Sequence, residues 1–180
     1  MSGTEHLAPR PGIAARLLRL LRHRWLDGSA ARRLPADAQE RLAERVAASE
    51  RLHSGQIRIC VEAGLPLSYL WRGLDARARA LALFGRLRVW DTEHNNGVLI
   101  YLLLADHAIE IVADRALARA CPAGTWQQLA LTLEQHLRGE SLEDGLTQAL
   151  AEVSALLQAH FAAPPGAAPA PGLPDAPVLL

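Results

Sequence analysis

Five oxygen-bearing side chains stand around one short loop and the end of a nearby strand. Asp91, Glu93, Asn95 and Asn96 lie in the loop, and Asp114 follows the second of two apolar runs. Carboxylates, amide oxygens and water are the ligands that hard cations such as Ca²⁺ and Mg²⁺ take, whereas zinc prefers nitrogen and sulfur. This set therefore predicts a Ca²⁺ or Mg²⁺ site.

A structural role explains the same residue types equally simply. Asn95 and Asn96 can shape the turn before Gly97, and Asp91 and Asp114 can cap neighbouring helices. The spacing itself is not that of an EF-hand loop, so both interpretations stay open at this stage.

Two apolar runs after the loop predict a β-hairpin that would position these side chains. Residues 97–104 are almost all branched or aromatic, as in a strand buried on both faces, and residues 109–112 continue at strand propensity. A tight antiparallel return at Asp106 would place Asp114 opposite residues 97–99. Asp106 itself would lie at the far end of the hairpin, away from the oxygen cluster.

The order of the expected elements indicates the fold class. Asp37 and Glu40 have the spacing of a capping box, and the helix after Asp75 places its arginines, Arg79 among them, mostly toward water. A strand, helix, strand unit favours a parallel pair, so we expect an α/β fold with a central mixed sheet, one antiparallel hairpin and helices on both faces. Helix starts are expected at Asp37, Asp75, Thr125 (with Gln128) and Ser141, with a strand over 56–63.

A cationic amphipathic segment precedes this unit. Over residues 13–26 leucines and Trp25 share one helical face, and arginines share the other. Such a helix could lie on an anionic membrane surface, or it could pack on its own domain with the arginines in water. The residues proposed for membrane or partner contact are Arg16, Arg19, Arg22 and Trp25.

The composition excludes several classes of protein. The formal net charge is zero, which gives no reason to expect a nucleic-acid partner, and no lysine is present for a P-loop or a Schiff base. Cys60 and Cys121 have no metal or redox spacing and are expected to be buried thiols in a reducing compartment. No signal peptide or membrane span is visible, so we expect a cytoplasmic protein, peripheral to the inner membrane if the basic helix binds there.

The chain is divided by these patterns into three parts. Residues 1–33 form a flexible N-terminus with the basic helix, residues 34–161 the folded domain, and residues 162–180 a tail rich in Pro and Ala. The last residues of the tail, 173–180, are apolar again and could dock on the domain.

The loop and hairpin together resemble the TPM domain, a family that includes thylakoid lumen phosphatase-like proteins, photosystem II repair factors and bacterial YgcG-like proteins. The resemblance covers about residues 37–161, and the chain resembles the short soluble bacterial branch of the family. It is carried by Trp90, Asn96, Gly97, Val98, Leu99, Asp106 and residues 110–114, with Glu50, His53, Ser54, Gly55 and an ending that contains Leu173, Pro174, Asp175, Pro177 and Val178. In this chain Asn95 stands where the family usually has an aspartate, and Ala116 where a glycine often follows.

The resemblance implies a three-layer α/β sandwich, a divalent-cation site near the Asn-Gly loop in some members, and weak acid phosphatase activity in some. Two functions follow as hypotheses. In the preferred one the chain is an interaction protein that docks a partner or a membrane complex as an assembly or maintenance factor. In the alternative it is a metal-assisted phosphomonoesterase in which Asp91, Glu93, Asn96 and Asp114 hold the cation and a bound water attacks a small phosphoester; no catalytic residue is assigned.

Overall fold

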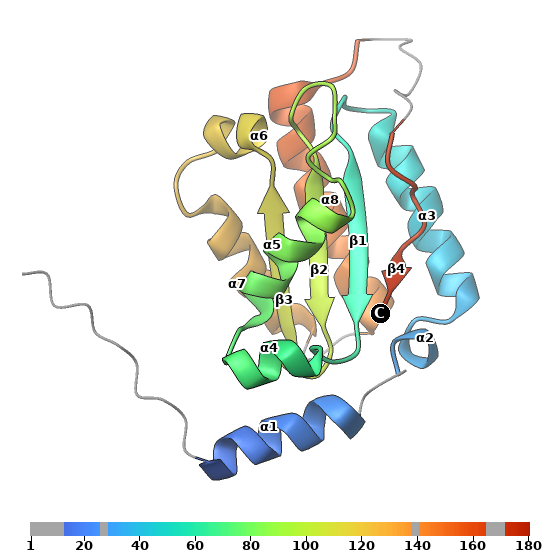
Figure 1. Ribbon diagram of the computed structural model, residues 1–180. Helices are drawn as coiled ribbons and strands as arrows, with labels where there is room; N and C mark the ends of the chain where they lie inside the picture. The colour runs from blue at the N-terminus through green and yellow to red at the C-terminus, as the bar shows by residue number, and fades with distance from the viewer. Residues whose placement is uncertain (1–12, 26–28, 138–140, 165–171) are drawn as a thin grey trace, which may run out of the picture.

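The computed structural model describes residues 13–25, 29–137, 141–164 and 172–180 of the chain (Figure 1). Eight helices and four strands are defined within these ranges. Their bounds are α1 Ile13–Trp25, α2 Ala30–Arg33, α3 Ala36–Glu50, β1 Ile57–Glu62, α4 Leu67–Arg72, α5 Ala76–Arg86, β2 Val98–Leu103, β3 Ala108–Ala113, α6 Arg115–Ala120, α7 Thr125–Leu137, α8 Leu142–Phe161 and β4 Val178–Leu179.

The four strands form one mixed sheet in the order β3-β2-β1-β4. β1 is parallel to β2, and β2 is antiparallel to β3, as the sequence predicts. Val98 is paired with Ala113, so Asp114 lies beside Gly97, and the Asp114 N–H donates to the Gly97 carbonyl at 2.8 Å. The predicted hairpin, its register and the position of Asp106 in the far turn are confirmed.

Helices cover both faces of the sheet and make three layers (Figure 1). On one face, α3, α7 and α8 pack residues such as Leu42, Leu133 and Val153 against the strand side chains that point to that face. On the other face α4 and α5 cover a smaller core that includes Leu83 and Tyr101. All six residues of β2 are buried, because this strand lies between two neighbours and under helices on both sides.

The helix starts agree with the sequence in two cases and differ in two. Asp75 accepts from the Ala78 N–H and Ser141 accepts from the Asp144 N–H, as expected of N-caps. The capping box of Asp37 and Glu40 was wrong, because α3 begins after Pro35, which leaves Asp37 inside the first turn. Thr125 is the first residue of α7, but its hydroxyl donates to the Pro122 carbonyl at 2.8 Å and caps no helical N–H.

The end of the chain completes the sheet. β4 pairs in parallel with β1, and the Leu180 backbone exchanges hydrogen bonds with Val61 and Ala63. The docking that the sequence allowed for residues 173–180 is therefore observed as an added strand. Among the helices described, none has both the length and the apolar character to cross a membrane.

Candidate functional site

The loop between α5 and β2 is held in a narrow fold at the end of the sheet where β1 and β2 begin. Arg88 and Asn95 have left-handed backbone angles, with φ of 56° and 52°. A Cβ at Gly97 would lie 2.0 Å from the Val89 carbonyl oxygen, so only glycine fits this close approach of the two loop ends. The fold brings Asn96 and the end of β3 to the same place.

Asn96 is fully buried in this fold. Its backbone N–H donates to Thr92 Oγ1 at 3.1 Å, and its Nδ2 donates to Ser54 Oγ at 3.2 Å. The side-chain oxygen, Oδ1, is buried and has no hydrogen-bond donor within the described chain. A buried acceptor without a donor is uncommon in proteins and marks a place where a further group can bind.

Asp114 carries a second buried oxygen of the same kind. The residue is 7% exposed and is the N-cap of α6, where its Oδ1 accepts from the Arg115 backbone N–H at 2.7 Å. Its Oδ2 is buried and again lacks a donor in the part of the chain that the structure describes. Asp114 thus fills the structural role considered for it, and one carboxylate oxygen remains available.

The other three predicted ligands lie on the same loop but nearer to water. Asp91 is exposed and pairs with Arg88 at 2.9 Å, and Glu93 is exposed. Asn95 is half-buried, and its Oδ1 accepts from Arg115 Nε at 3.2 Å. Within the described residues no three His, Cys, Asp or Glu side chains are grouped to hold a metal ion.

Asn96 Oδ1 and Asp114 Oδ2, which have no donor among the described residues, are the kind of oxygen that hard cations take. Water would have to supply most of the remaining ligands, unless Asp91 and Glu93 turn inward from their exposed positions. A cation held there would polarise a phosphate oxygen and lower the pKa of a bound water.

The segment before β1 supports this site from behind. Ser54 holds the Asn96 amide, and a Cβ at Gly55 would lie 3.1 Å from the Asn96 carbonyl oxygen. His53 is buried, 2.8 Å from Ser49 Oγ and 3.1 Å from the Gly55 carbonyl oxygen, and burial lowers its pKa. Glu50 accepts from the Ile57 N–H at 2.9 Å, and burial raises its pKa to about 7. Ser54 and Gly55 therefore contact the loop, whereas Glu50 and His53 hold the turn between α3 and β1.

A second candidate surface lies at the opposite end of the sheet, where α1 runs beside α4 (Figure 1). The polar face of α1 is turned toward the domain. Arg19 Nη2 lies 3.2 Å from Asp106 Oδ2, Arg22 also binds this carboxylate, and His23 Nε2 lies 3.1 Å from Asp106 Oδ1. His23 is 2% exposed, and its Nδ1 accepts from the Leu65 N–H at 2.9 Å.

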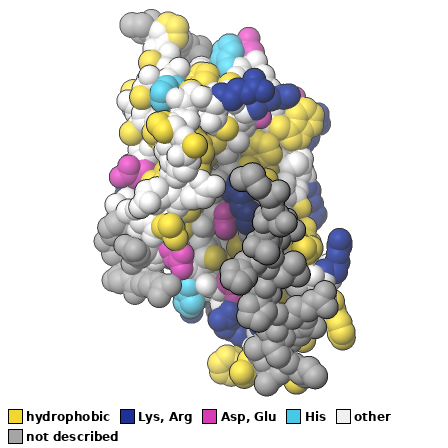
Figure 2. Space-filling view, turned by 90° about the vertical axis from the view of Figure 1, so that its left-hand side faces the viewer, with side chains coloured by type: hydrophobic (Ala, Val, Ile, Leu, Met, Phe, Trp, Pro, Cys, Tyr) yellow, Lys and Arg dark blue, Asp and Glu magenta, His cyan; other side chains and the backbone are white. Residues whose placement is uncertain are grey.

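The apolar face of α1 is consequently turned outward. Leu18 and Leu21 are 68% and 66% exposed, and Trp25 is 91% exposed. This differs from the arrangement expected of the helix packed on its own domain, because the arginines and not the leucines make the contact. Hydrophobic side chains are visible at this lower end of the molecule in Figure 2. The side chain of Arg16 lies outside the described residues.

A buried ionic cluster beneath α5 was missed by the sequence patterns. Arg79 binds Glu62 with both Nε and Nη2, at 2.9 and 2.7 Å, and the Tyr101 hydroxyl donates to Glu62 Oε2 at 2.7 Å. The expectation that Arg79 faces water was wrong, because its guanidinium is turned to the buried carboxylate of Glu62 at the end of β1. Burial raises the pKa of the neighbouring Cys60 thiol to about 12, and Cys60 and Cys121 are both buried and unbridged. The cluster has the geometry of a structural support.

The layered α/β architecture with this loop defines the class of protein, and comparison with known proteins gives its family. The sequence profile of the TPM domain matches residues 29–156, and the chain belongs to the TPM domain family. No curated protein matches the sequence.

Two solved structures share the fold. The NMR structure of BA42 protein from the psychrophilic bacterium Bizionia argentinensis has a TM-score of 0.69 at 20% identity, covering 81% of this chain and 94% of that one. The N-terminal domain of a protein from P. gingivalis has a TM-score of 0.51 at 21% identity, covering 71% and 79%. The three-layer TPM-like architecture is thus confirmed.

Proposed function

We propose that this TPM-domain chain is an interaction protein that attaches to an anionic membrane surface through the outward face of α1. The observation that carries the proposal is the exposure of Leu17, Leu18, Leu21 and Trp25 on one side of a helix whose other side is fixed to Asp106. A row of large apolar side chains held in water is typical of a contact surface.

The charge of this end of the molecule favours lipid over a neutral protein surface. α1 contains four arginines and no acidic residue, and Arg32 and Arg33 follow on α2 with exposed side chains. Asp106 neutralises only one of the two guanidinium groups that bind it, so net positive charge remains on the domain side of α1, opposite the leucines. Interfacial helices combine such basic residues with Leu and Trp.

Flotation with vesicles tests the proposal. The full chain should float with vesicles of phosphatidylcholine and phosphatidylglycerol, and should float poorly with phosphatidylcholine alone or at high salt. Each large apolar side chain contributes about 1.5–3 kcal/mol when removed from water, so the pair of changes Leu21→Ser and Trp25→Ala should reduce binding at least tenfold.

Trp90→Ala is the matched control, because Trp90 is an exposed tryptophan (45%) on the loop of the cation site, away from α1. It should float like the unchanged protein. Equal loss in both variants, or no flotation of the unchanged protein with anionic vesicles, contradicts the membrane proposal and leaves a protein partner for this surface.

A second candidate function rests on Asn96 Oδ1 and Asp114 Oδ2, two buried oxygens that have no donor among the described residues. It is a divalent-cation site that supports weak hydrolysis of phosphomonoesters. Titration calorimetry with Ca²⁺ and with Mg²⁺ should give heat for the unchanged chain and none for Asp114→Asn, while Glu152→Gln, which removes an exposed carboxylate on α8, should bind normally. Phosphate-ester turnover that persists in Asp114→Asn contradicts the enzymatic part.

A further inference from the structure

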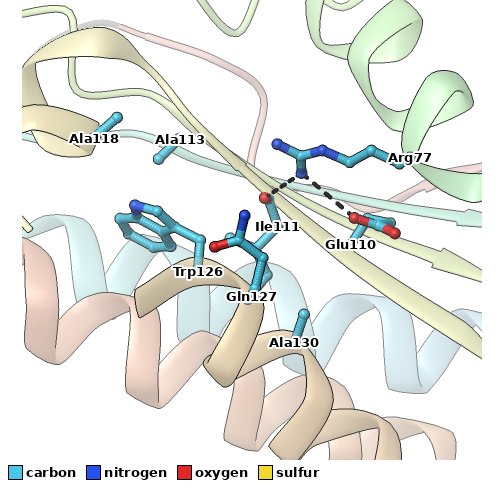
Figure 3. A pocket seen from close by; sticks show the side chains of 8 residues that line it. All are labelled: Arg77, Glu110, Ile111, Ala113, Ala118, Trp126, Gln127 and Ala130. Carbon is cyan, nitrogen blue, oxygen red and sulfur yellow. Dashed lines mark hydrogen bonds and ion pairs between the residues drawn. The ribbon is translucent and has the colours of Figure 1, made fainter. Parts of the chain in front are cut away.

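A hollow lies beside β3, the terminal strand of the sheet, between the two helical layers. α5 packs on one face of β3 and α7 on the other, and the hollow has a volume of about 340 Å³, within the usual range of ligand pockets (Figure 3). The eight described residues that line it lie on α5, β3, α6 and α7. The hollow is therefore separate from α1 and from the loop of the cation site.

Small and aromatic side chains make the apolar part of the hollow. Ala113, Ala118 and Ala130 line it from three different elements, and their short side chains leave the space unfilled. The ring of Trp126 and the buried residue Ile111 complete this wall. Such a wall suits a short aliphatic chain, because moving methylene groups from water to an apolar surface favours binding.

A hydrogen-bond donor in this wall lacks an acceptor. Trp126 Nε1 is buried and has no partner among the described residues. In Figure 3 the edge of the ring that carries this nitrogen is turned toward Ala113 and Ala118, whose side chains offer no acceptor. Buried indole N–H groups usually have a partner, so a carbonyl oxygen that enters the hollow suits this position.

The other polar side chains of the lining are balanced in charge. Arg77 Nη1 donates to the Ile111 carbonyl at 2.8 Å and lies 3.4 Å from Glu110 Oε2, so the cation and the anion that line the hollow are paired. Gln127 directs its side-chain amide, which both donates and accepts, toward β3. A neutral ligand group that both donates and accepts matches this lining better than a charged one.

We propose that the hollow binds a small neutral amide with a short aliphatic chain. The ligand carbonyl accepts from Trp126 Nε1, the ligand N–H donates to the side-chain oxygen of Gln127, and the chain lies over the three alanines. A carboxylate would also accept from Trp126, but it would add an unpaired negative charge near Glu110. An ammonium group has no acceptor for the indole N–H.

NMR titration of the full, isotope-labelled chain with pentanamide tests the proposal. The indole N–H signal of Trp126 should shift in a saturable way, with a dissociation constant on the order of 1 mM, as expected for a ligand of few atoms. The indole signals of Trp25, Trp71 and Trp90 should stay in place. Pentanoate should bind about fivefold more weakly or worse, and pentylammonium should leave the Trp126 signal unmoved.

Trp126→Phe separates the effect of the donor from that of the ring. The change keeps an aromatic wall and removes the N–H, so it should weaken pentanamide binding about tenfold, measured through the backbone amide signals of Ala113 and Ala118. Trp71→Phe is the matched control, because Trp71 lies on α4 and is 79% exposed. It should bind pentanamide like the unchanged chain.

A second pair of variants fills the hollow and leaves Trp126 in place. Ala118→Leu enlarges an exposed residue of the lining and should weaken binding about tenfold, whereas Ala120→Leu, on the same helix outside the lining, should not. The proposal is overturned if pentanamide leaves the Trp126 signal unmoved at about ten times the expected dissociation constant, or if all the indole signals shift alike. It is also overturned if folded Trp126→Phe or Ala118→Leu binds like the unchanged chain, or if pentanoate binds as tightly as pentanamide.

Discussion

His23 and Asp106 lie 83 residues apart in the chain and meet at 3.1 Å, where they join α1 to the turn of the hairpin. The Leu65 N–H donates to His23 Nδ1, so the ring must carry its proton on Nε2 and donate it to the carboxylate. Gly64 permits the approach, because a Cβ there would lie 2.6 Å from the His23 carbonyl oxygen. The orientation of α1 thus depends on one buried imidazole and one carboxylate.

Asp106→Asn should release α1 without unfolding the sheet. The change leaves Arg19, Arg22 and His23 without their anion, at a local cost of about 1–3 kcal/mol. Hydrogen exchange should accelerate over residues 13–25 and stay slow in β1 and β2. Asp91→Asn removes an exposed partner of Arg88 and should change stability by no more than about 0.5 kcal/mol.

Acidification should loosen the same helix. Burial lowers the pKa of His23 below its ordinary value of 6.5, with smaller contributions from Asp106, which raises it, and from Arg19 and Arg22, which lower it. A lowered folded-state pKa means that the stabilisation is complete above about pH 6.5 and is lost as the pH falls through the folded value. Protonated Nδ1 also cannot accept from Leu65.

Fluorescence of Trp25 and exchange over residues 13–25, measured from pH 8 to pH 5, check this prediction. His23→Gln should remove the pH dependence of α1, whereas His94→Gln, a change in the exposed loop, should preserve it. A local readout is needed because His53 is also buried with a lowered pKa and contributes to the global pH dependence.

Gly97→Ala should destabilise the domain strongly. The added Cβ would meet the Val89 carbonyl oxygen at 2.0 Å, and a backbone atom cannot move aside cheaply. We expect a loss of about 3 kcal/mol or more in the free energy of unfolding, measured by urea denaturation. Gly85→Ala, inside α5, should instead stabilise the domain by about 0.5–1 kcal/mol, because a Cβ added there would have no neighbouring atom within 4 Å.

Glu62→Gln should test the ionic cluster under α5. The side chains of Arg79 and Glu62 are 11% and 4% exposed, so removing the carboxylate leaves a buried cation and costs about 3–5 kcal/mol. Denaturation with urea measures the loss. Asp37→Asn removes the exposed partner of Arg41 and should leave the free energy of unfolding nearly unchanged; comparable losses in both variants would mean that Glu62 is not the buried anion described.

The sheet could be predicted from the sequence because continuous apolar runs mark the buried strands and the hairpin turn sets their register. A return at Asp106 places Asp114 opposite residues 97–99 and Asp106 at the far end of the hairpin, and the structure has Asp114 beside Gly97. The helix in front of the domain could not be oriented in this way. Both faces of an amphipathic helix can make contacts. Arg19 and His23 face inward because Asp106 and the backbone of Leu65 and Leu74 bind them.

The candidate site could be located from the sequence only in outline. Residue types placed Asn96 and Asp114 at one end of the hairpin, but the burial of their free oxygens depends on the close return of the loop at Gly97. The hollow lined by Ala113, Ala118 and Ala130 could not be predicted from the sequence, because these alanines lie on three separate elements. The pairing of Glu62 with Arg79 was also not predicted, because a contact between a helix and the end of a strand leaves no periodic pattern in the sequence.

The position of β4 orders the events of folding. Arg58 of β1 donates to the Ala176 carbonyl, 118 residues further along the chain. During synthesis from the N-terminus, the edge of β1 must therefore stay uncovered while β2, β3 and the last helices are made. Until the segment with β4 arrives, the β1 edge of the nascent sheet lacks this partner strand and can pair with another chain.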